Sequence, residues 1–440
     1  MKPLEPATSA VPASRLSRLA RLGSLASGVA GAMLSEGVQQ LSQGKRPKID
    51  DLLLTPANAR RVVEELVQLR GAAMKVGQLL SMDAGDLLPP ELSEILARLR
   101  SDARPMPMSQ LVDVLNATWG AGWEHRFQGF SFTPLAAASI GQVHLAQTKD
   151  GRQLAVKVQY PGVRQSIASD VDNVATLLRM SGLLPKALDI APLVEDAKRQ
   201  LQDEADYVLE AAYLTRYRAL LGASTEFVLP EVDNELTTSN ILAMSYVEGV
   251  PIESLLTAPQ AERNRLLSLL FALLFLEIFD FHLIQTDPNF ANYRYDTADG
   301  RLVLLDFGAT RVYGKPMVAA YRRLLTAGMQ EDMVAANIAA TEIGYFQSDI
   351  QERHRHLVLD IFNLACEPLR HQGAYDFGNS DLAIRVRDRG LRLGTERDFS
   401  HTPPVDALFL HRKIGGLYLL AAKLRARVDI RALFMPHALM

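Results

Sequence analysis

The spacing of apolar residues along the chain changes its period near Phe130. Before this point, apolar residues in the segment 57–82 recur every three or four positions, which predicts a helix with one buried face. The recurring positions are Val62, Leu66, Leu69, Ala73, Val76 and Leu80. Pro89 and Pro90 end this pattern, and the segment 91–100 predicts a second helix.

After Phe130 the apolar positions alternate as they do in strands. The segment 130–161 predicts strand, tight loop, strand, a turn at Lys149–Arg152 and a further strand. A long helical pattern follows Pro192, and the segment 240–251 predicts a strand that ends in a Gly/Pro connector. Helical patterns then dominate to the end of the chain, apart from a short hairpin predicted within 291–308. The order of elements therefore predicts an α+β protein.

One apolar run is long enough to be considered as a membrane span. Leu266–Ile284 could cross a bilayer on length alone, but Glu277, Asp280 and His282 near its end are costly in hydrocarbon. We therefore expect a buried core helix. The apolar run Gly23–Leu34 is too short to span.

Composition and charge narrow the range of partners and compartments. The net charge of −3 lacks the basic excess typical of nucleic-acid binding, so we expect no nucleic-acid partner. The single cysteine, Cys366, permits no internal disulfide, which fits a reducing compartment, and its apolar surroundings predict a buried packing residue. His354 and His356 lie on a polar helix, where a solvated face is expected rather than a metal site.

Residues 1–50 differ in composition from the rest of the chain. Arg15, Arg18 and Arg21 recur beside leucines, and acidic residues are few. Two interpretations stay open: attachment to an anionic membrane surface, or a solvated arm. No apolar core follows a basic start, so we expect no cleavable signal peptide.

Lys157 is a lysine within an apolar strand and therefore needs an anionic partner. Its neighbours Val156 and Val158 point to the opposite face of the strand. One candidate partner is a carboxylate on the helix after Pro192, and the other is a phosphate. The carboxylates on that helix are Glu204, Asp206 and Glu210, of which the last two share a helical face.

An aspartate, an asparagine and a second aspartate follow in an order that kinases use. Asp287 is followed by Asn292 five positions later, and Asp306 begins an Asp-Phe-Gly sequence. In kinases the loop Asp orients the nucleophile, while the Asn and the second Asp bind metal ions. The predicted hairpin between Asn292 and Asp306 would fold the two metal ligands together. The ordered set, together with the strand lysine, predicts a site for MgATP.

Two features differ from an ordinary protein kinase. The loop before Lys157 holds Ala136, Ala137 and Ala138 where kinases place glycines, and alanine disfavours positive φ. This loop must therefore be stiffer and hold phosphates differently. After Asp306 the chain returns to helix within about a dozen residues and has no Ala-Pro-Glu. A platform for a peptide substrate is missing.

With these departures, the chain resembles the UbiB family of atypical kinases, also called AarF-like. It looks closest to the coenzyme Q branch of that family. The segments that carry the resemblance are "KVGQ" (Lys75–Gln78), "AAASIGQVH" (Ala136–His144), "EADYVLEA" (Glu204–Ala211), "QTDPNFANYRY" (285–295) and "LLDFGATR" (304–311). The C-terminal "RKIGGLYLLAAKLRARV" (412–428) is also similar to the family. Many members read "HADPHPGN" where this chain reads "QTDPNFAN", so that Thr286 replaces the His before the catalytic Asp, and Ser245 stands where an acidic residue is frequent.

The resemblance implies a bilobal protein-kinase-like fold with an N-terminal helical Lys-x-Gly-Gln extension. The implied division is a basic arm (1–50), the extension (51–129), a kinase-like N-lobe (130–250) and a helical C-lobe (251–440). The extension would lie over the site where a protein substrate docks. The gating residues would be Lys75 and Gln78 of the extension with Glu204 and Asp206 of the N-lobe.

The resemblance also implies the residues that hold ATP or ADP with Mg²⁺. Lys157 would pair with Glu210, with Glu204 as the second choice, and Asp287 would be catalytic. The remaining nucleotide contacts would be Ala136, Ala137, Ala138, Ser139, Met244, Tyr246 and Val247. Asn292 and Asp306 would be the metal ligands.

The favoured function is an MgATP-dependent ATPase or small-molecule kinase that supports ubiquinone biosynthesis. The alternative is a non-catalytic, nucleotide-gated scaffold that recruits lipid or biosynthetic enzymes, and a trans-acting protein kinase is less favoured. The expected partners are the nucleotide, an anionic membrane surface, a quinone-precursor lipid and ubiquinone-biosynthesis enzymes. The expected location is the cytoplasm, with any membrane contact peripheral at the inner membrane.

Overall fold

The computed structural model describes residues 71–73, 75–77, 105–180, 190–287, 289–346, 350–395 and 403–438. The described residues form two compact units. The first is drawn from residues 1–211 and 231–246, and the second from residues 212–230 and 247–440. Helices and mainly antiparallel sheets occur together, which confirms the predicted α+β class. The predicted arm 1–50, most of the predicted extension and Gln78 lie outside the described residues.

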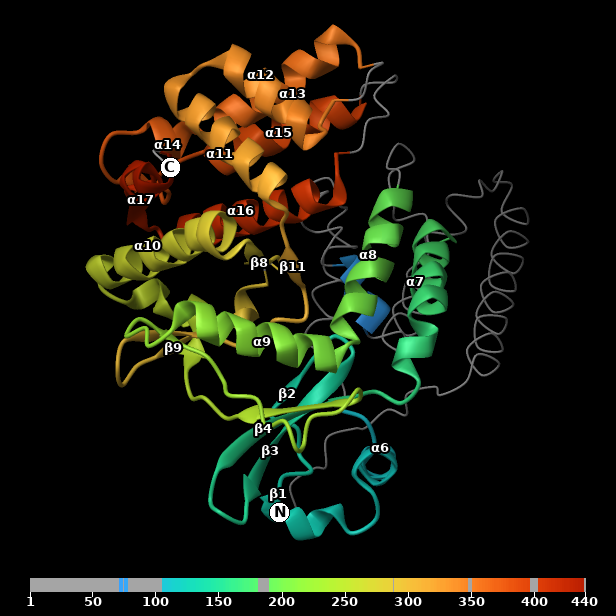
Figure 1. Ribbon diagram of the computed structural model, residues 1–440. Coiled ribbons are helices and arrows are strands. Elements are labelled where there is room, and N and C mark those ends of the chain that lie inside the picture. The colour runs from blue at the N-terminus through green and yellow to red at the C-terminus, as the bar shows by residue number, and fades with distance from the viewer. Residues whose placement is uncertain are drawn as a thin grey trace, which may run out of the picture. The chain divides into compact units, whose positions relative to one another are not determined.

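An antiparallel sheet is the centre of the first unit (Figure 1). Its strands are β1 (Phe127–Phe130), β2 (Ala136–Ala137), β3 (Gly141–Thr148), β4 (Gln153–Gln159) and β6 (Ile241–Ser245). The order is β1-β3-β4-β6, and β2 pairs with the beginning of β3. The turn between β3 and β4 lies at 149–152 as predicted, and Gly151 supplies its positive φ of 89°.

Helices flank this sheet and close its apolar core. They are α6 (Met108–Trp119), the 3₁₀ turn η2 (Trp123–Arg126), α7 (Val163–Met180), α8 (Ala191–Glu204) and the first part of α9 (Tyr207–Leu221). Trp119, Trp123 and Phe127 pack against one another and against buried strand residues such as Val156 and Val158. α7 and α8 lie side by side (Figure 1).

The helical pattern after Pro192 does not form one continuous helix. α8 ends at Glu204, and α9 begins at Tyr207 after a break at Ala205 and Asp206. The sequence argument that Asp206 and Glu210 share a helical face is therefore wrong, because Asp206 precedes the first turn of α9. Glu204 and Glu210 stand on separate helices.

Helices make up most of the second unit. In chain order they are the end of α9, η3 (Ile252–Thr257), α10 (Gln260–Leu276), η4 (Glu277–Phe281), η5 (Phe290–Asn292), α11 (Lys315–Gln330), α12 (Met333–Ile343), α13 (Glu352–Ala365), α14 (Glu367–Arg370), α15 (Leu382–Thr395), α16 (Val405–Lys423) and α17 (Ile430–Ala438). α11 packs against α12, α13 packs against α15, and α10 contacts both α16 and α17 (Figure 1).

Short strands complete the second unit. They are β5 (Phe227–Val228), β7 (Val250–Pro251), β8 (Leu283–Gln285), β9 (Tyr293–Asp296), β10 (Arg301–Leu304), β11 (Thr310–Val312), β12 (Tyr375–Asp376) and β13 (Arg427–Val428). One sheet has the order β5-β10-β9-β7, β8 pairs with β11, and β12 pairs with β13. β9 and β10 are the antiparallel hairpin that the sequence predicts between Asn292 and Asp306.

The apolar run Leu266–Ile284 is buried as predicted, but it is not one helix. α10 ends at Leu276, a π-helical turn covers Glu277–Phe281, and β8 begins at Leu283. His282 ends the turn with a left-handed φ of 50°, which redirects the chain into the strand. Among the described residues, no helix has the length and apolar character needed to cross a membrane.

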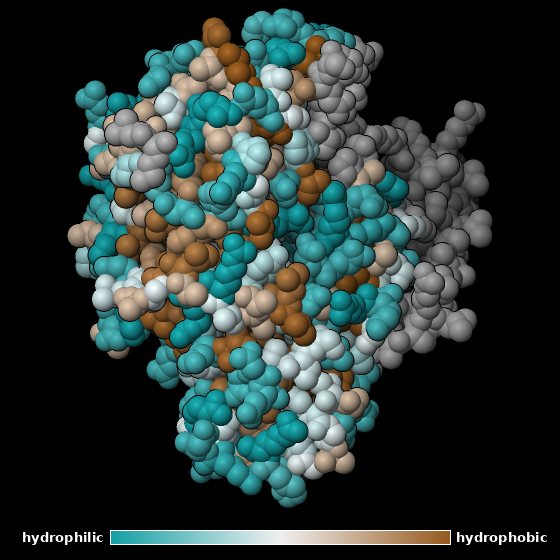
Figure 2. Space-filling model, viewed as in Figure 1, coloured by the Kyte–Doolittle hydropathy of each residue, from teal (hydrophilic) through white to brown (hydrophobic). Residues whose placement is uncertain are grey.

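Single residues of the sequence analysis are placed as follows. Cys366 is buried, as predicted, against Gly328. His356 lies on the exposed face of α13, but His354 is fully buried, so the expectation of a solvated His354 is wrong. The described residues contain no cluster of acidic, His or Cys side chains with the geometry of a metal site. On the face drawn in Figure 2, hydrophobic residues lie in small groups separated by hydrophilic ones.

Candidate active site

Lys157 and Glu210 form a buried ion pair in the first unit. Lys157 is in β4, where it is paired with Val143 of β3 and Leu242 of β6. Its Nζ donates to Glu210 Oε1 at 2.9 Å and to Oε2 at 3.1 Å. Glu210 lies in the first turn of α9, so the helix N-terminus also stabilises its negative charge. The structure thus brings together the strand lysine and the first-choice carboxylate.

Lys75 and Glu204 form a second buried contact in the same unit. Lys75 Nζ donates to Glu204 Oε1, and the Ser139 hydroxyl donates to Glu204 Oε2. An added Cβ on Gly71 would lie only 2.1 Å from the Ser139 carbonyl oxygen, so the helical residues 71–73 lie against this loop at Gly71. Glu204 therefore ties the helical segment to the loop that the sequence assigns to nucleotide phosphates.

The alanine loop is partly a strand. Ala136 and Ala137 form β2 and are exposed, and the Ala138 amide donates to the Gly141 carbonyl at 2.9 Å in a tight turn.

Asp206, a predicted gating residue, accepts from the Leu209 amide at 3.0 Å and pairs with Arg164 at 3.3 Å. Asp206 thus caps α9.

Three of the predicted nucleotide contacts lie at and after the end of β6. Met244 is buried in β6, and the Tyr246 amide donates to the Gln153 carbonyl of the neighbouring β4 at 2.9 Å. Tyr246 and Val247 are half-buried in the connector that follows. The connector belongs to the first unit as far as Tyr246 and to the second from Val247.

Asp287 and Asn292 are in direct contact in the second unit. Asn292 Nδ2 donates to Asp287 Oδ2 at 3.2 Å, and the Asn289 amide donates to Asp287 Oδ1 at 3.3 Å. Before this loop, the Thr286 hydroxyl donates to the Ala309 carbonyl at 2.6 Å. Thr286 therefore links the loop to the segment that follows Asp306.

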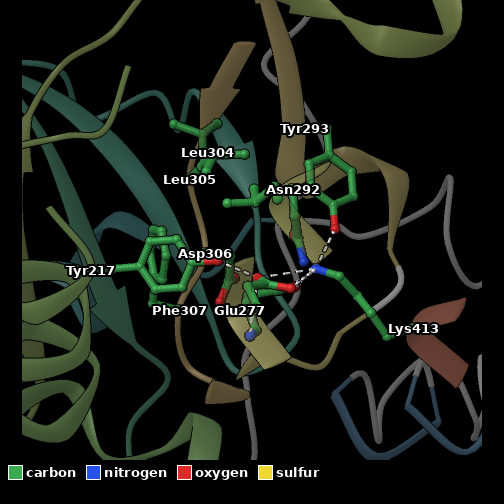
Figure 3. A pocket seen from close by; sticks show the side chains of 11 residues that line it. Tyr217, Glu277, Asn292, Tyr293, Leu304, Leu305, Asp306, Phe307 and Lys413 are labelled. Carbon is green, nitrogen blue, oxygen red and sulfur yellow. Dashed lines mark hydrogen bonds and ion pairs between the residues drawn. The ribbon is translucent and has the colours of Figure 1, made fainter. Parts of the chain in front are cut away.

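Asp306 follows β10 and faces the same pocket as Asn292. The hairpin folds the chain back so that the Leu305 amide donates to the Asn292 carbonyl at 3.2 Å. Asn292 and Asp306 both line one pocket of the second unit (Figure 3). Asp306 Oδ1 accepts from the Gly308 amide at 3.0 Å, which fixes the carboxylate. Phe307 packs its ring on Tyr217 with centroids 4.8 Å apart.

A buried polar group that the sequence analysis did not assign forms another wall of this pocket. In Figure 3, Lys413 reaches toward Glu277 and Tyr293. Lys413 Nζ lies 2.9 Å from the Tyr293 hydroxyl and 3.4 Å from Glu277 Oε2, and the Tyr217 hydroxyl donates to Glu277 Oε1. Burial raises the pKa of Glu277 above its usual value. Burial disfavours the charge of Lys413, but Glu277 and Tyr293 outweigh it and raise the pKa of Lys413.

Two weak signals in the sequence pointed toward this group. Glu277 is an acidic residue in an otherwise apolar run, and Lys413 lies in the C-terminal segment that is similar to the UbiB family. Neither signal names the other residue, because 136 positions separate them.

The donor atoms of the second unit fit a magnesium ion. The carboxylate of Asp306 and the amide oxygen of Asn292 are hard oxygen ligands of the kind that Mg²⁺ prefers, and both line the same pocket. Mg²⁺ sites in phosphate-binding proteins use one or two protein ligands and complete the shell with water and phosphate.

Comparison with known proteins gives consistent relatives. Residues 98–339 match the model of the ABC1 atypical kinase-like domain. The chain is 37% identical over 430 residues to "Atypical kinase COQ8, mitochondrial" of Saccharomyces cerevisiae, covering 97% of this chain and 85% of that protein. It is also 37% identical to "Atypical kinase coq-8, mitochondrial" of Caenorhabditis elegans, covering 97% of this chain but 57% of that one.

A solved structure shares the fold. The structure described as the complex of Rv3197 with erythromycin from Mycobacterium tuberculosis matches with a TM-score of 0.56 and 26% identity. The match covers 87% of this chain and 95% of that chain.

Proposed function

Because the chain belongs to the ABC1 atypical kinase-like family, we propose that it is an MgATP-dependent ATPase or small-molecule kinase that supports ubiquinone biosynthesis. The observation that carries the proposal is the arrangement of Asp287, Asn292 and Asp306. Asp287 and Asn292 share a hydrogen bond, and Asn292 and Asp306 line one pocket. Protein kinases use an Asp, an Asn and a second Asp in this order for phosphoryl transfer from a metal-bound nucleotide.

Each polar residue of the second unit has a distinct proposed role. Asp287 accepts the proton of the attacking hydroxyl or water, and its contact with Asn292 holds the carboxylate in place. Asn292 and Asp306 hold the metal through their side-chain oxygens. Bound there, Mg²⁺ would supply positive charge that offsets the negative charge developing on the phosphates during transfer.

The first unit has its own proposed nucleotide contacts. Lys157 would contact phosphate while Glu210 fixes the direction of its side chain. Ala136, Ala137, Ala138 and Ser139 would face the phosphates, and Met244, Tyr246 and Val247 would contact the base. The buried pair of Lys157 and Glu210 supports this assignment, since Glu210 is the anionic partner that a buried lysine needs and it orients the ammonium group.

Small acceptors or water are the proposed substrates, in preference to polypeptides. Lys75 and Glu204 fasten the helical segment 71–77 to the loop at Ser139, and we assign gating to this contact and to Gln78 and Asp206. After Asp306 the chain enters β11 at Thr310 and α11 at Lys315. This leaves little chain for a peptide platform.

A nucleotide-gated scaffold is the second candidate. The observation that favours it is the Ser139 hydroxyl, which already donates to Glu204 and so is engaged away from a phosphate. The two functions differ in their need for Asp287. The test is quinone synthesis in a deletion strain. If Asp287→Asn restores this synthesis and Lys157→Ala does not, the result favours the scaffold.

We also propose that the protein works at a membrane surface of anionic lipid, with a quinone-precursor lipid and ubiquinone-biosynthesis enzymes as partners. The relatives from yeast and from the worm carry the word mitochondrial in their names. For this chain we propose a cytoplasmic location, peripheral to the inner membrane. In the described part of the chain, no helix is long and apolar enough to cross a membrane.

ATP turnover of Asp306→Asn tests the enzyme proposal. We expect turnover to fall by about 100-fold or more, because the substitution removes a charged metal ligand. Asp299→Asn is the matched control, since this residue is exposed in the turn of the same hairpin. Equal turnover of Asp306→Asn and wild type would refute the proposal. Complementation of a deletion strain by the same variants, read by quinone profiling, then tests the biosynthetic role.

A further inference from the structure

Lys413 of α16 is buried within the second unit, and its ammonium group is fully engaged. It is 3% exposed, and its Nζ donates to the Tyr293 hydroxyl at 2.9 Å, to Gln285 Oε1 at 3.2 Å and to Glu277 Oε1 at 3.5 Å. A lysine ammonium has three N–H donors, and these contacts account for all of them. Lys413 therefore has no donor left for a phosphate, although it lines the same pocket as Asn292 and Asp306.

Two of the contacts of Lys413 are with the two ends of one loop. Gln285 is the last residue of β8 and precedes Asp287 by two positions. Tyr293 is the first residue of β9 and follows Asn292 directly. By contacting both residues, Lys413 fixes the separation of the points where the loop begins and ends. The loop between them carries the hydrogen bond from Asn292 to Asp287.

Glu277 provides the charge that keeps Lys413 in this position. It is fully buried at the start of the π-helical turn before β8. Besides Lys413, it accepts from the Tyr217 hydroxyl and from the Gln285 amide, the latter at 3.4 Å. The carboxylate thus contacts both Lys413 and the strand that leads into the loop. Without Glu277, the buried ammonium would lack a counter-charge.

We propose that Lys413 is a positioning residue for the metal site, that it sets the geometry of the Asp287–Asn292 loop through Gln285 and Tyr293, and that Glu277 holds it there. The inference rests on the proposed function in that Asn292 and Asp306 are taken as the metal ligands. Lys413 acts on the metal through the loop and contacts neither metal nor nucleotide. A positioning role of this kind affects metal-dependent steps more than binding of the free nucleotide.

Two variants separate positioning from folding. Tyr293→Phe removes only the hydroxyl that accepts from Lys413 and keeps the ring in place. The double variant Glu277→Gln/Lys413→Met removes both buried charges together, so that neither is left uncompensated. Tyr345→Phe is the control, because it also removes one buried hydroxyl, which bonds Tyr321 and His411 and none of the residues that Lys413 contacts. Circular dichroism and thermal melting establish that each variant is folded.

The readout is the dissociation constant of a fluorescent ATP analogue with and without Mg²⁺, together with kcat and KM for ATP. We expect Tyr293→Phe and the double variant to lose about 10-fold or more of the Mg²⁺-dependent affinity and of kcat, as loss of groups that orient metal ligands usually does. Affinity for the Mg²⁺-free analogue stays within about two-fold of wild type, and Tyr345→Phe behaves as wild type in every measurement.

The outcomes distinguish this inference from the proposed function. Wild-type Mg²⁺ dependence in both variants, with loss of it in Asp306→Asn, would overturn the positioning role and leave the proposed function standing. An equal loss in Tyr345→Phe would also overturn it, since general destabilisation would then account for the effect. If Asp306→Asn itself keeps full Mg²⁺ dependence, the proposed metal site fails, and the inference fails with it.

Discussion

Gly141 is required by the packing of two strands. It is the only glycine in the segment 136–144, where protein kinases place several to approach phosphates. At this position an added Cβ would lie 2.3 Å from the Val158 carbonyl oxygen, closer than any real contact. The close approach of β3 to β4 therefore explains this glycine without a ligand. The resemblance to a phosphate-binding loop at this residue is partly a consequence of strand packing.

Substitution of Gly141 by alanine should therefore destabilise the fold. We expect Gly141→Ala to lower the free energy of unfolding by about 1–3 kcal/mol, the usual cost of forcing a methyl group into packed structure. Urea denaturation measures the change. Gly129→Ala in β1 is the control, because its added Cβ meets nothing within 4 Å. If both variants are equally stable, strand packing does not explain Gly141.

At the scale of elements, the break between α8 and α9 separates three acidic residues. Glu204 ends α8 and contacts Lys75, Glu210 lies within α9 and contacts Lys157, and Asp206 stands between them. Asp206 Oδ1 accepts from the Leu209 amide, as the side chain of an N-cap residue does. The break thus lets neighbouring carboxylates serve two different lysines.

The capping role of Asp206 can be separated from its proposed gating role. We expect Asp206→Ala to lower the free energy of unfolding by about 1 kcal/mol through loss of the cap, and Asp206→Asn to stay within about 0.5 kcal/mol of wild type. Chemical denaturation measures both. The asparagine variant keeps the cap but loses the charge, so a change in its ATP turnover at unchanged stability would report the gating role. Equal loss of stability in both variants would contradict the cap.

Strands and the hairpin could be predicted from alternation, whereas the end of α10 could not. Residues 266–284 are apolar almost throughout, and a continuous apolar run does not distinguish a buried helix from a buried strand. The pairing of β8 with β11 decides the outcome, and this partner lies 25 residues farther along the chain between Gln285 and Thr310. The break after Glu204 could not be predicted either, because the helical spacing of apolar residues continues across it.

At the scale of the whole molecule, some residues of the candidate site could be predicted from their order in the sequence, and others could not. Lys157, Asp287, Asn292 and Asp306 follow a sequence order that phosphoryl-transfer proteins use, so they could be proposed together. Lys413 has no such order, because 128 positions separate it from Gln285. Its role depends on how α16 packs, which no local pattern encodes.

A second group of distant residues in the second unit affects stability as a function of pH. His411 of α16 lies under the ring of Tyr345, with ring centroids 5.4 Å apart, and the Tyr345 hydroxyl contacts its Nε2. Tyr345 in turn bonds Tyr321 of α11 at 2.9 Å. Burial, together with the neighbouring Arg412 guanidinium, lowers the pKa of His411 to about 4. The imidazole is therefore neutral in the folded protein over the physiological pH range.

This lowered pKa makes the fold sensitive to mild acid. The His411 pKa is 6.5 before folding and about 4 after it, so below pH 6.5 the unfolded chain binds a proton that the folded chain rejects. The stabilising contribution is complete above pH 6.5 and is lost as the pH falls toward 4. The total is at most about 3 kcal/mol, since one pKa unit corresponds to about 1.4 kcal/mol and the ring retains some exposure. Urea denaturation between pH 7.5 and 4.5 measures the loss. His411→Gln should have a lower free energy of unfolding than wild type at pH 7.5, and this free energy should change less with pH. A variant whose stability falls as steeply as wild type over this range would show that other groups carry the acid sensitivity.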